Sequence, residues 1–303
     1  MNVARAAVDG PWLERTLAEI IRDAAENRSP DGADGPLFGP PAVGVVDGDD
    51  PLFEAFAEAV DSRHLRPRAF LERHAPRGSD LTCVRVVAWA LPYAENIRRS
   101  NRRGDWPSSL YSLARNLGGA LCLEAGRRMA RALEAVGGAA LSPALTGDAD
   151  AFRSPTTVFS STWSERHVAY AAGLGVFGLN GGLITRLGIH VRLGSLVTNL
   201  PVPCAAGPPR GGHRAPCLAD GGASCGLCIG RCPVGAVSRD GLDKAKCNGR
   251  RKAVQSRAQT AGPDSGRLLA HRQIVNGRPA WRVPLGCALC QCGVPCEGSN
   301  PFV

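Results

Sequence analysis

The sequence is poor in aromatic residues and has no long apolar run. Aromatic side chains make up 5% of the 303 residues, which argues against a platform on which nucleic-acid bases stack. No stretch is long enough to cross a bilayer, because Arg85 interrupts the apolar segment TCVRVVAWAL. The first residues, MNVARAAVDGPW, contain no continuous apolar region of the kind found in secretory signals. These absences predict a cytoplasmic protein with no membrane contact.

The sequence also has no excess of acidic residues and no long run of basic ones. Lys and Arg number 36 against 27 Asp and Glu, which gives a formal net charge of +9. Such a charge is compatible with nucleic-acid binding, with a solvated basic surface, or with docking of an acidic electron donor. Because the basic residues are scattered along the chain, the charge alone gives weak support to RNA binding.

Cysteine is abundant and unevenly distributed. Ten of the twelve cysteines lie from Cys204 onward. In a reducing compartment this number favours metal or redox chemistry over a disulfide framework. A hydrophobic fraction of 44% permits a substantial buried core in addition to the cysteine-rich region.

Helical and strand patterns alternate up to residue 202. Asp9 and Pro11 are suited to the start of the first helix, whereas Gly118-Gly119 leaves open whether the longest segment is one helix or two. Helices are expected over residues 11–26, 51–60, 106–136 and 164–175. Strands are expected over residues 42–46 and 83–91, and a strand–turn–strand unit over residues 181–202. The Pro/Gly-rich stretch PVPCAAGPPRGGHRAP then predicts a linker, and hence two domains, 1–202 and 203–303.

The segment CGLCIGRCPVGA resembles the ligand run of a bacterial ferredoxin with one cysteine missing. Its three cysteines are Cys225, Cys228 and Cys232. The first cysteine of such a run would fall at Gly222. Cys217, eight residues before Cys225, can return across the intervening loop and replace it, and Cys204 is the alternative. The cysteine before Pro233 is expected to serve a second cluster, as it does in two-cluster ferredoxins.

A second set of cysteines completes a scheme of two [4Fe–4S] clusters. The first cluster is expected to be held by Cys217, Cys225, Cys228 and Cys296. The second cluster is expected to be held by Cys232, Cys247, Cys287 and Cys290. Cys292 is then spare, although it could replace Cys296. The competing interpretation is a zinc site, but an all-thiolate zinc site uses only four cysteines. Cys83 and Cys122 lie on apolar segments and are expected to be small core residues.

Two further stretches resemble a known family. ERHVAYAAGLGVFGLNGGLIT at 165–185 and RLGSLVTNLPV at 192–202 are similar to the corrinoid-binding core of epoxyqueuosine reductases and reductive dehalogenases. The later run CALCQCGVPCE resembles reductases related to epoxyqueuosine reductase. The resemblance covers about residues 80–300 and implies an α+β fold, with a nitroreductase-like α/β/α domain followed by a ferredoxin-like module with two [4Fe–4S] clusters.

The resemblance also implies a base-off cobalamin beside the nearer cluster. Glycine lets a backbone approach a large flat ring closely, and the polar residues that follow the glycines are expected to contact the edge of the ring. The expected cobalamin contacts are Gly173, Gly175, Gly178, Asn180, Gly194 and Ser195. The competing interpretation is that the glycines only end a helix and shape turns.

The sequence departs from the family in two places. Epoxyqueuosine reductases carry an acidic proton donor six residues before the Glu-Arg pair at 165–166, where this chain has Phe159. Tyr170, Glu165 and His167 are therefore the candidate catalytic residues, although each could have a structural role. The sequence also ends at Val303, before the helical-repeat segment with which family members hold tRNA. This departure disfavours tRNA and favours a small-molecule substrate.

These features predict an iron–sulfur oxidoreductase that uses cobalamin and two clusters to reduce an unidentified small molecule. A low-potential donor, ferredoxin or flavodoxin, would supply the electrons. The first alternative is an epoxyqueuosine reductase acting on queuosine-modified tRNA. The second alternative is a ferredoxin-type electron-transfer protein that binds no corrinoid.

Overall fold

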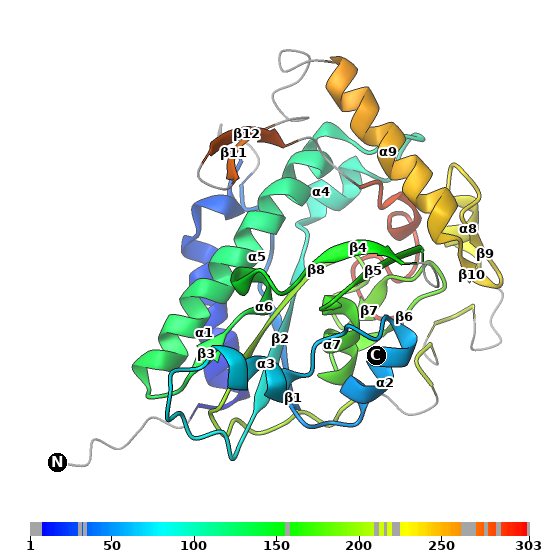
Figure 1. The fold of residues 1–303 in the computed structure, drawn as a ribbon. Helices are drawn as coiled ribbons and strands as arrows, with labels where there is room; N and C mark the ends of the chain where they lie inside the picture. The colour runs from blue at the N-terminus through cyan, green and yellow to red at the C-terminus, as the bar shows by residue number, and fades with distance from the viewer. Residues whose placement is uncertain are drawn as a thin grey trace.

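An antiparallel sheet of four strands lies at the centre of the molecule (Figure 1). The structure is a computed structural model, and it describes residues 8–29, 32, 35–154, 158–208, 212–214, 217–219, 225–261, 271–275, 278–282 and 286–301. The strand order is β1 (Ala42–Asp47), β2 (Arg85–Pro92), β8 (Val191–Thr198) and β3 (Ala140–Leu141). β2 and β8 pair over their full lengths, and Trp89 lies opposite Gly194.

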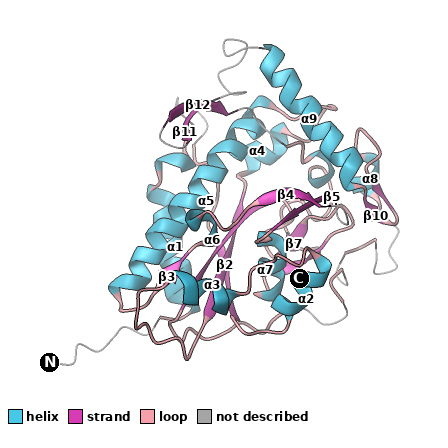
Figure 2. Ribbon diagram, in the orientation of Figure 1, coloured by secondary structure: helices cyan, strands magenta, loops and turns pink. Residues whose placement is uncertain are grey.

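Helices cover both faces of this sheet, as the ribbon in Figure 2 also shows. Alternate residues of β2 face opposite sides, as strand geometry requires. Val87, Trp89 and Leu91 pack on the side of α1 (Gly10–Asp23) and α5 (Ser109–Ala135). Val86, Ala88 and Ala90 pack on the side of α2 (Leu52–Ala59), α3 (Pro67–His74) and α7 (Glu165–Ala171). The result is a three-layer α/β/α arrangement.

The first helix begins where the sequence predicts. The Asp9 carboxylate accepts a hydrogen bond from the Trp12 backbone N–H at 2.8 Å, which caps the first turn of α1. The buried residues of this helix recur at helical spacing and form one apolar stripe against the core. These residues are Leu13, Leu17, Ile20 and Ile21.

The longest predicted segment is one continuous helix. α5 runs through Gly118 and Gly119 without a break. A Cβ atom at Gly118 would collide with the ring of Phe38. The glycine is therefore explained by close packing of the helix against a neighbouring loop, and the packing offsets the low helix propensity of glycine.

Short elements complete the first two hundred residues. They are the 3₁₀ turn η1 (Ala25–Asn27), the helices α4 (Glu95–Ser100) and α6 (Pro143–Thr146), and the strand pairs β4 (Ala151–Ser154) with β5 (Val158–Ser161) and β6 (Gly175–Phe177) with β7 (Leu183–Thr185). The predicted strand–turn–strand unit at 181–202 corresponds to β7 and β8. The predicted helix at 164–175 is shorter and corresponds to α7.

The described part of the cysteine-rich region contains one long helix and several short elements. Its elements are α8 (Leu227–Gly230), β9 (Val237–Ser238), β10 (Gly241–Leu242), α9 (Lys244–Ala261), the hairpin of β11 (His271–Val275) with β12 (Arg278–Arg282), and the 3₁₀ turn η2 (Leu289–Gln291). Arg250 and Arg257 of α9 place their guanidinium carbons 3.7 and 4.4 Å from the ring centroid of Trp106. These cation–π contacts hold α9 against the loop before α5.

Packing crosses the predicted domain boundary near residue 203. Val176, Leu179, Ile184 and Ile189 form one buried cluster with Cys217 and Val237. The C-terminal segment 286–301 also returns to the first domain, where the Ile189 backbone N–H donates to the Cys296 carbonyl at 2.7 Å. The assignment of two domains therefore stays a prediction.

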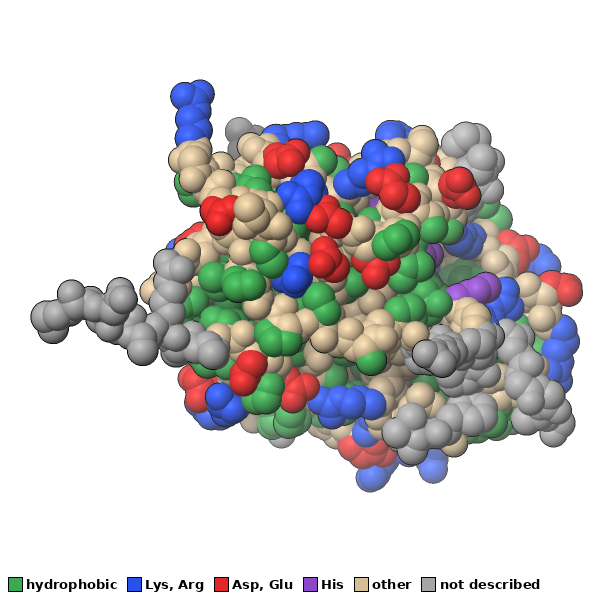
Figure 3. All heavy atoms as spheres, turned by 90° about the horizontal axis from the view of Figure 1, so that it is seen from below, with side chains coloured by type: hydrophobic (Ala, Val, Ile, Leu, Met, Phe, Trp, Pro, Cys, Tyr) green, Lys and Arg blue, Asp and Glu red, His purple; other side chains and the backbone are tan. Residues whose placement is uncertain are grey.

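Basic side chains do not form one patch on the face shown in Figure 3, where acidic and basic side chains are interspersed. Of the helices in the described part of the chain, none combines the length and apolar character that a membrane span requires.

Candidate functional site

A cavity of about 460 Å³ lies where the sheet domain meets the cysteine-rich region. Its walls come from α5, the start of α7, the start of β8, α9 and the segment around η2. Among the described residues, the lining includes thiols, arginines, two tyrosines and a single carboxylate, that of Glu165. The volume lies within the usual range for small-molecule sites, about 300–1,000 Å³.

Glu165 is held at the cavity wall by a short chain of hydrogen bonds. The Trp163 indole N–H donates to the Ser195 hydroxyl at 2.8 Å, and that hydroxyl donates to Oε2 of Glu165 at 2.7 Å. Burial raises the pKa of Glu165 to about 7, although the Ser195 hydrogen bond and the positive charge of Arg192 oppose the shift. A carboxyl group with such a pKa can hold and release a proton near neutral pH.

The other two candidate catalytic residues lie away from this cavity. His167 exchanges a hydrogen bond with the Ser164 hydroxyl at 2.7 Å, and burial with the nearby charge of Arg166 lowers the pKa of His167 to about 3. Its ring and the ring of Tyr170 pack against Phe177. Neither side chain lines the cavity, so of the three candidates only Glu165 does.

Asn180 is the one predicted cobalamin contact that lines the cavity. Its side-chain amide donates to the Cys290 carbonyl at 2.8 Å and accepts from the Gly182 backbone N–H at 3.0 Å. Gly178 lies nearby, on the wall of a second and much smaller pocket that Asn180 also lines. Asn180 therefore links the β6–β7 region to the cysteine-rich segment.

At the other predicted cobalamin contacts, the space beside the residue is filled by other parts of the protein. A Cβ at Gly173 would lie 2.7 Å from the Gly207 carbonyl oxygen. A Cβ at Gly194 would lie 2.7 Å from the ring of Trp89. Two further residues, Gly175 and Ser195, contact Ile184 and Glu165 respectively. None of these residues lines the cavity, so their role in holding a corrinoid stays a prediction.

Four thiols surround the smaller pocket, and we call them the first thiol group: Cys217, Cys225, Cys228 and Cys296. Burial and the neighbouring Cys217 and Cys225 raise the pKa of Cys228 to about 11. Burial and the neighbouring Cys217 and Cys228 raise the pKa of Cys296 to about 12. Thiolates this close repel one another, and a cationic metal centre relieves that repulsion.

Four other thiols line the large cavity, and we call them the second thiol group: Cys232, Cys247, Cys287 and Cys290. The pKa of Cys290 is raised by burial and then by the other three members of this group. The backbone N–H of Ala236 donates to the Cys232 sulfur at 3.1 Å. Two sets of four sulfurs are a donor set that fits two [4Fe–4S] clusters. The assignment of the individual ligands stays a prediction.

The alternative ligands are placed elsewhere. Cys204 is exposed, and Cys292 lines neither pocket. Cys292 is instead fully buried beside His190, with 3.4 Å between its sulfur and Nδ1. Cys83 and Cys122 are half-buried, and Cys122 packs against the core.

Five arginines also line the cavity, and sequence reasoning did not find them: Arg115, Arg166, Arg192, Arg250 and Arg251. Burial lowers the pKa of Arg115, and the nearby charges of Arg192 and Arg251 lower it further. Only Arg251 could have been predicted from the sequence, because it lies four residues after Cys247 on a helix and so shares a face with that thiol. The other arginines come from distant elements that only the fold brings together.

Comparison with solved structures finds a similar fold. An epoxyqueuosine reductase bound to an epoxyqueuosine-modified tRNA stem loop is 19% identical, with a TM-score of 0.51, and the match covers 94% of this chain and 64% of that chain. A selenomethionine-labelled epoxyqueuosine reductase is 16% identical, with a TM-score of 0.50 and the same coverage. A reductive dehalogenase bound to 3-bromo-4-hydroxybenzoic acid is 15% identical, with a TM-score of 0.44, over 80% of this chain and 33% of that chain.

No protein-family profile matches the sequence, and a search of curated proteins finds no match. The chain spans about 64% of the length of the two epoxyqueuosine reductases. The resemblance predicted from the sequence is confirmed at the level of the fold: this chain folds like an epoxyqueuosine reductase.

Proposed function

We propose that this chain is an iron–sulfur oxidoreductase that reduces a small anionic molecule in the cavity beside the second thiol group. The observation that carries the proposal is the lining of that cavity, which combines four thiols, one carboxyl group and five arginines. An electron source, a proton source and an anion-binding surface therefore adjoin the same space. The fold similarity to epoxyqueuosine reductase supports the same class of reaction.

In this proposal each thiol group holds one [4Fe–4S] cluster. The first thiol group lines a pocket too small for a substrate, about 30 Å³, and the second lines the large cavity. When bound, the clusters supply single electrons at low potential. The second thiol group is then the one adjacent to the substrate.

Binding of a corrinoid in the large cavity is a more specific part of the proposal. The large cavity adjoins the second thiol group, which is where a cofactor that takes electrons from a cluster would lie. The fit is incomplete, because of the six residues predicted to contact a corrinoid only Asn180 lines this cavity. The roles given below to Glu165 and the arginines do not depend on it.

Glu165 is the proton donor in this proposal. Reductive cleavage of a polarised bond R–X takes two electrons from the external donor and one proton, and gives R–H and X⁻. Glu165 lines the cavity, and Ser195 holds one of its carboxyl oxygens in place. Because burial raises its pKa to about 7, about half of the Glu165 side chains carry the proton at that pH.

The arginines define the class of substrate. Five guanidinium groups and one carboxyl group line the cavity, so the lining carries excess positive charge. Within the cavity, burial lowers the pKa of Arg115, and the charges of Arg192 and Arg251 lower it further. A carboxylate or phosphate group on the substrate would relieve this repulsion and form charge-assisted hydrogen bonds.

An acidic, low-potential donor such as ferredoxin or flavodoxin is the proposed electron source. The formal net charge of +9 favours its approach. Because salt screens such attraction, electron transfer from the donor should slow as ionic strength rises.

The experiment is anaerobic reconstitution with iron and sulfide, followed by elemental analysis, absorption and EPR. We expect a brown protein with about eight irons per chain. A colourless protein with one zinc and no sulfide would refute the proposal. Addition of cobalamin then tests the corrinoid alone: a base-off spectrum supports it, and an unchanged spectrum removes it while leaving the clusters in place.

The same preparation distinguishes the substrate classes. We expect small phosphorylated or carboxylated molecules to raise the midpoint of thermal unfolding. A protein that responds to queuosine-modified tRNA, and not to small anions or unmodified tRNA, would instead be a tRNA reductase. Binding of any tRNA with equal affinity and a steep salt dependence would be non-specific.

A further inference from the structure

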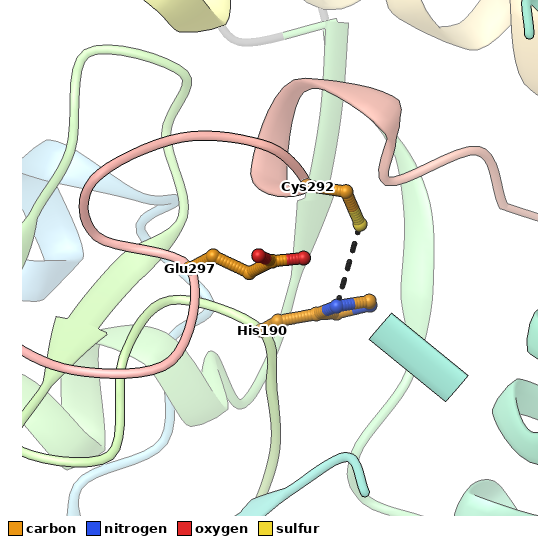
Figure 4. Close-up of side chains that lie close together, drawn as sticks. All are labelled: His190, Cys292 and Glu297. Carbon is orange, nitrogen blue, oxygen red and sulfur yellow. Dashed lines mark hydrogen bonds between the residues drawn. The ribbon is translucent and has the colours of Figure 1, made fainter. Parts of the chain in front are cut away.

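Three buried side chains outside both thiol groups meet at one point (Figure 4). His190 lies just before β8, whereas Cys292 and Glu297 lie in the C-terminal segment. One nitrogen, one sulfur and one carboxylate oxygen all lie within 4.8 Å of one another. The exposed fractions of the three residues are 1%, 0% and 6% in that order, so the point is closed to bulk solvent.

The described hydrogen bonds at this point involve only one of the two carboxylate oxygens of Glu297. Arg102 donates through Nε to Oε2 of Glu297 at 2.8 Å. The other oxygen, Oε1, is buried and has no hydrogen-bond partner among the described residues. In Figure 4 the carboxylate points toward Cys292 and His190. A buried carboxylate oxygen without a partner is destabilising, so this oxygen indicates that a ligand belongs at this point.

The surroundings orient the three side chains. Asn101 donates through Nδ2 to the Cys292 sulfur at 3.6 Å, and its side-chain oxygen accepts from the Ser108 backbone N–H at 2.9 Å. The Tyr93 ring packs against the imidazole of His190, with 4.5 Å between the ring centroids. Such neighbours fix the direction of ligands around metal ions in proteins.

We propose that His190, Cys292 and Glu297 form a third metal site, which binds one Zn²⁺ ion. A nitrogen, a thiolate and a carboxylate are a ligand set that zinc accepts, with water in the fourth position. Bond lengths of about 2.3 Å to sulfur and 2.0–2.1 Å to nitrogen, at a tetrahedral angle, place these two atoms about 3.5 Å apart. The separation between the Cys292 sulfur and Nδ1 of His190 is 3.4 Å.

Two negatively charged ligands would face the ion at this site. Zn²⁺ displaces the proton of the Cys292 thiol, and the resulting thiolate and the Glu297 carboxylate, which also pairs with Arg102, are those ligands. The ion would tie the C-terminal segment 286–301 to the start of β8. That segment carries cysteines of both thiol groups, so the zinc would position them relative to the sheet.

The test is the zinc content of the fully reconstituted protein. We expect about one zinc per chain in addition to the iron. Cys292→Ala and Glu297→Gln should each reduce zinc at least tenfold and leave the iron content unchanged. Cys83→Ala is the matched control, because it removes a thiol outside all three sites, and it should keep the zinc. Unchanged iron shows that a variant still folds.

Two results would overturn this site: a wild-type protein with full iron and no zinc, or variants that retain the zinc of the wild type. The outcome is separate from that of the proposed function. If the thiol groups themselves took up zinc instead of iron, the proposed function would fail. Loss of one zinc on Cys292→Ala, and not on Cys83→Ala, would still identify the third site.

Discussion

Replacement of Glu165 by glutamine tests whether the pKa of this cavity residue is raised, and the test requires no substrate. Burial raises the pKa of Glu165 from 4.5 to about 7. The folded protein therefore holds the proton more tightly than the unfolded chain does. Between these two pKa values the folded state binds more protons, so the free energy of unfolding falls as pH rises through this window. Glutamine has a similar shape and does not titrate.

The magnitude follows from the two pKa values. A shift of one pKa unit is worth about 1.4 kcal/mol. Integration of the linkage relation from about pH 5 to about pH 8 gives a loss of about 2–3 kcal/mol in the wild-type protein from this one group. The charged group that acts on it is Arg192 on β8, and the thiol of Cys122 on α5, whose pKa burial raises, is neutral over this range; the substitution leaves both in place.

The assay is urea unfolding of wild-type protein and Glu165→Gln under anaerobic conditions over this pH range. We expect the free energy of unfolding of the variant to exceed that of the wild type by about 2–3 kcal/mol more at the upper pH than at the lower. Effects of the substitution that do not depend on pH cancel in this difference. Parallel pH profiles for the two proteins would refute a raised pKa at Glu165, and with it the proton-donor role.

Three further perturbations have defined outcomes. Cys228→Ala removes one member of the first thiol group and should reduce the iron measured after reconstitution to about half. Gly194→Ala places a Cβ atom 2.7 Å from the Trp89 ring and should lower the free energy of unfolding by about 1–3 kcal/mol. Gly119→Ala is its control, because the nearest atom is the end of a flexible side chain at 3.5 Å, and it should raise that energy by about 0.5–1 kcal/mol in urea titrations. Inorganic phosphate should raise the thermal midpoint of the wild type more than that of Arg115→Gln, since that variant has lost one guanidinium group from the cavity.

Local signals were sufficient for much of the fold. Asp9 and Pro11 mark the start of α1 because a cap and a fixed φ act within one turn. The strand pattern at 83–91 predicts β2, since a strand buried on both faces is apolar throughout. The cysteine pattern predicted two sets of four thiols, and each set lines one pocket; that they are cluster ligands stays a prediction.

Long-range packing could not be predicted from local sequence signals. Gly118 reads as a weak point in a helix, and only the position of Phe38 explains it. Burial raises the pKa of Glu165, and its carboxyl group is hydrogen-bonded to Ser195, thirty residues away. The meeting of His190 with Cys292 spans 102 positions, and no periodicity in the sequence encodes it.

The members of the first thiol group are far apart in the sequence and are therefore synthesised at different times. The first thiol group begins with Cys217 and ends with Cys296, a span of 79 residues. At a translation rate of about 5–20 residues per second, this span takes about 4–16 s to synthesise. Throughout that interval the earlier cysteines emerge from the ribosome without their final partner. If these four thiols hold a cluster as proposed, the complete ligand set exists only after Cys296 has been synthesised, and the earlier thiols need a reducing environment until then.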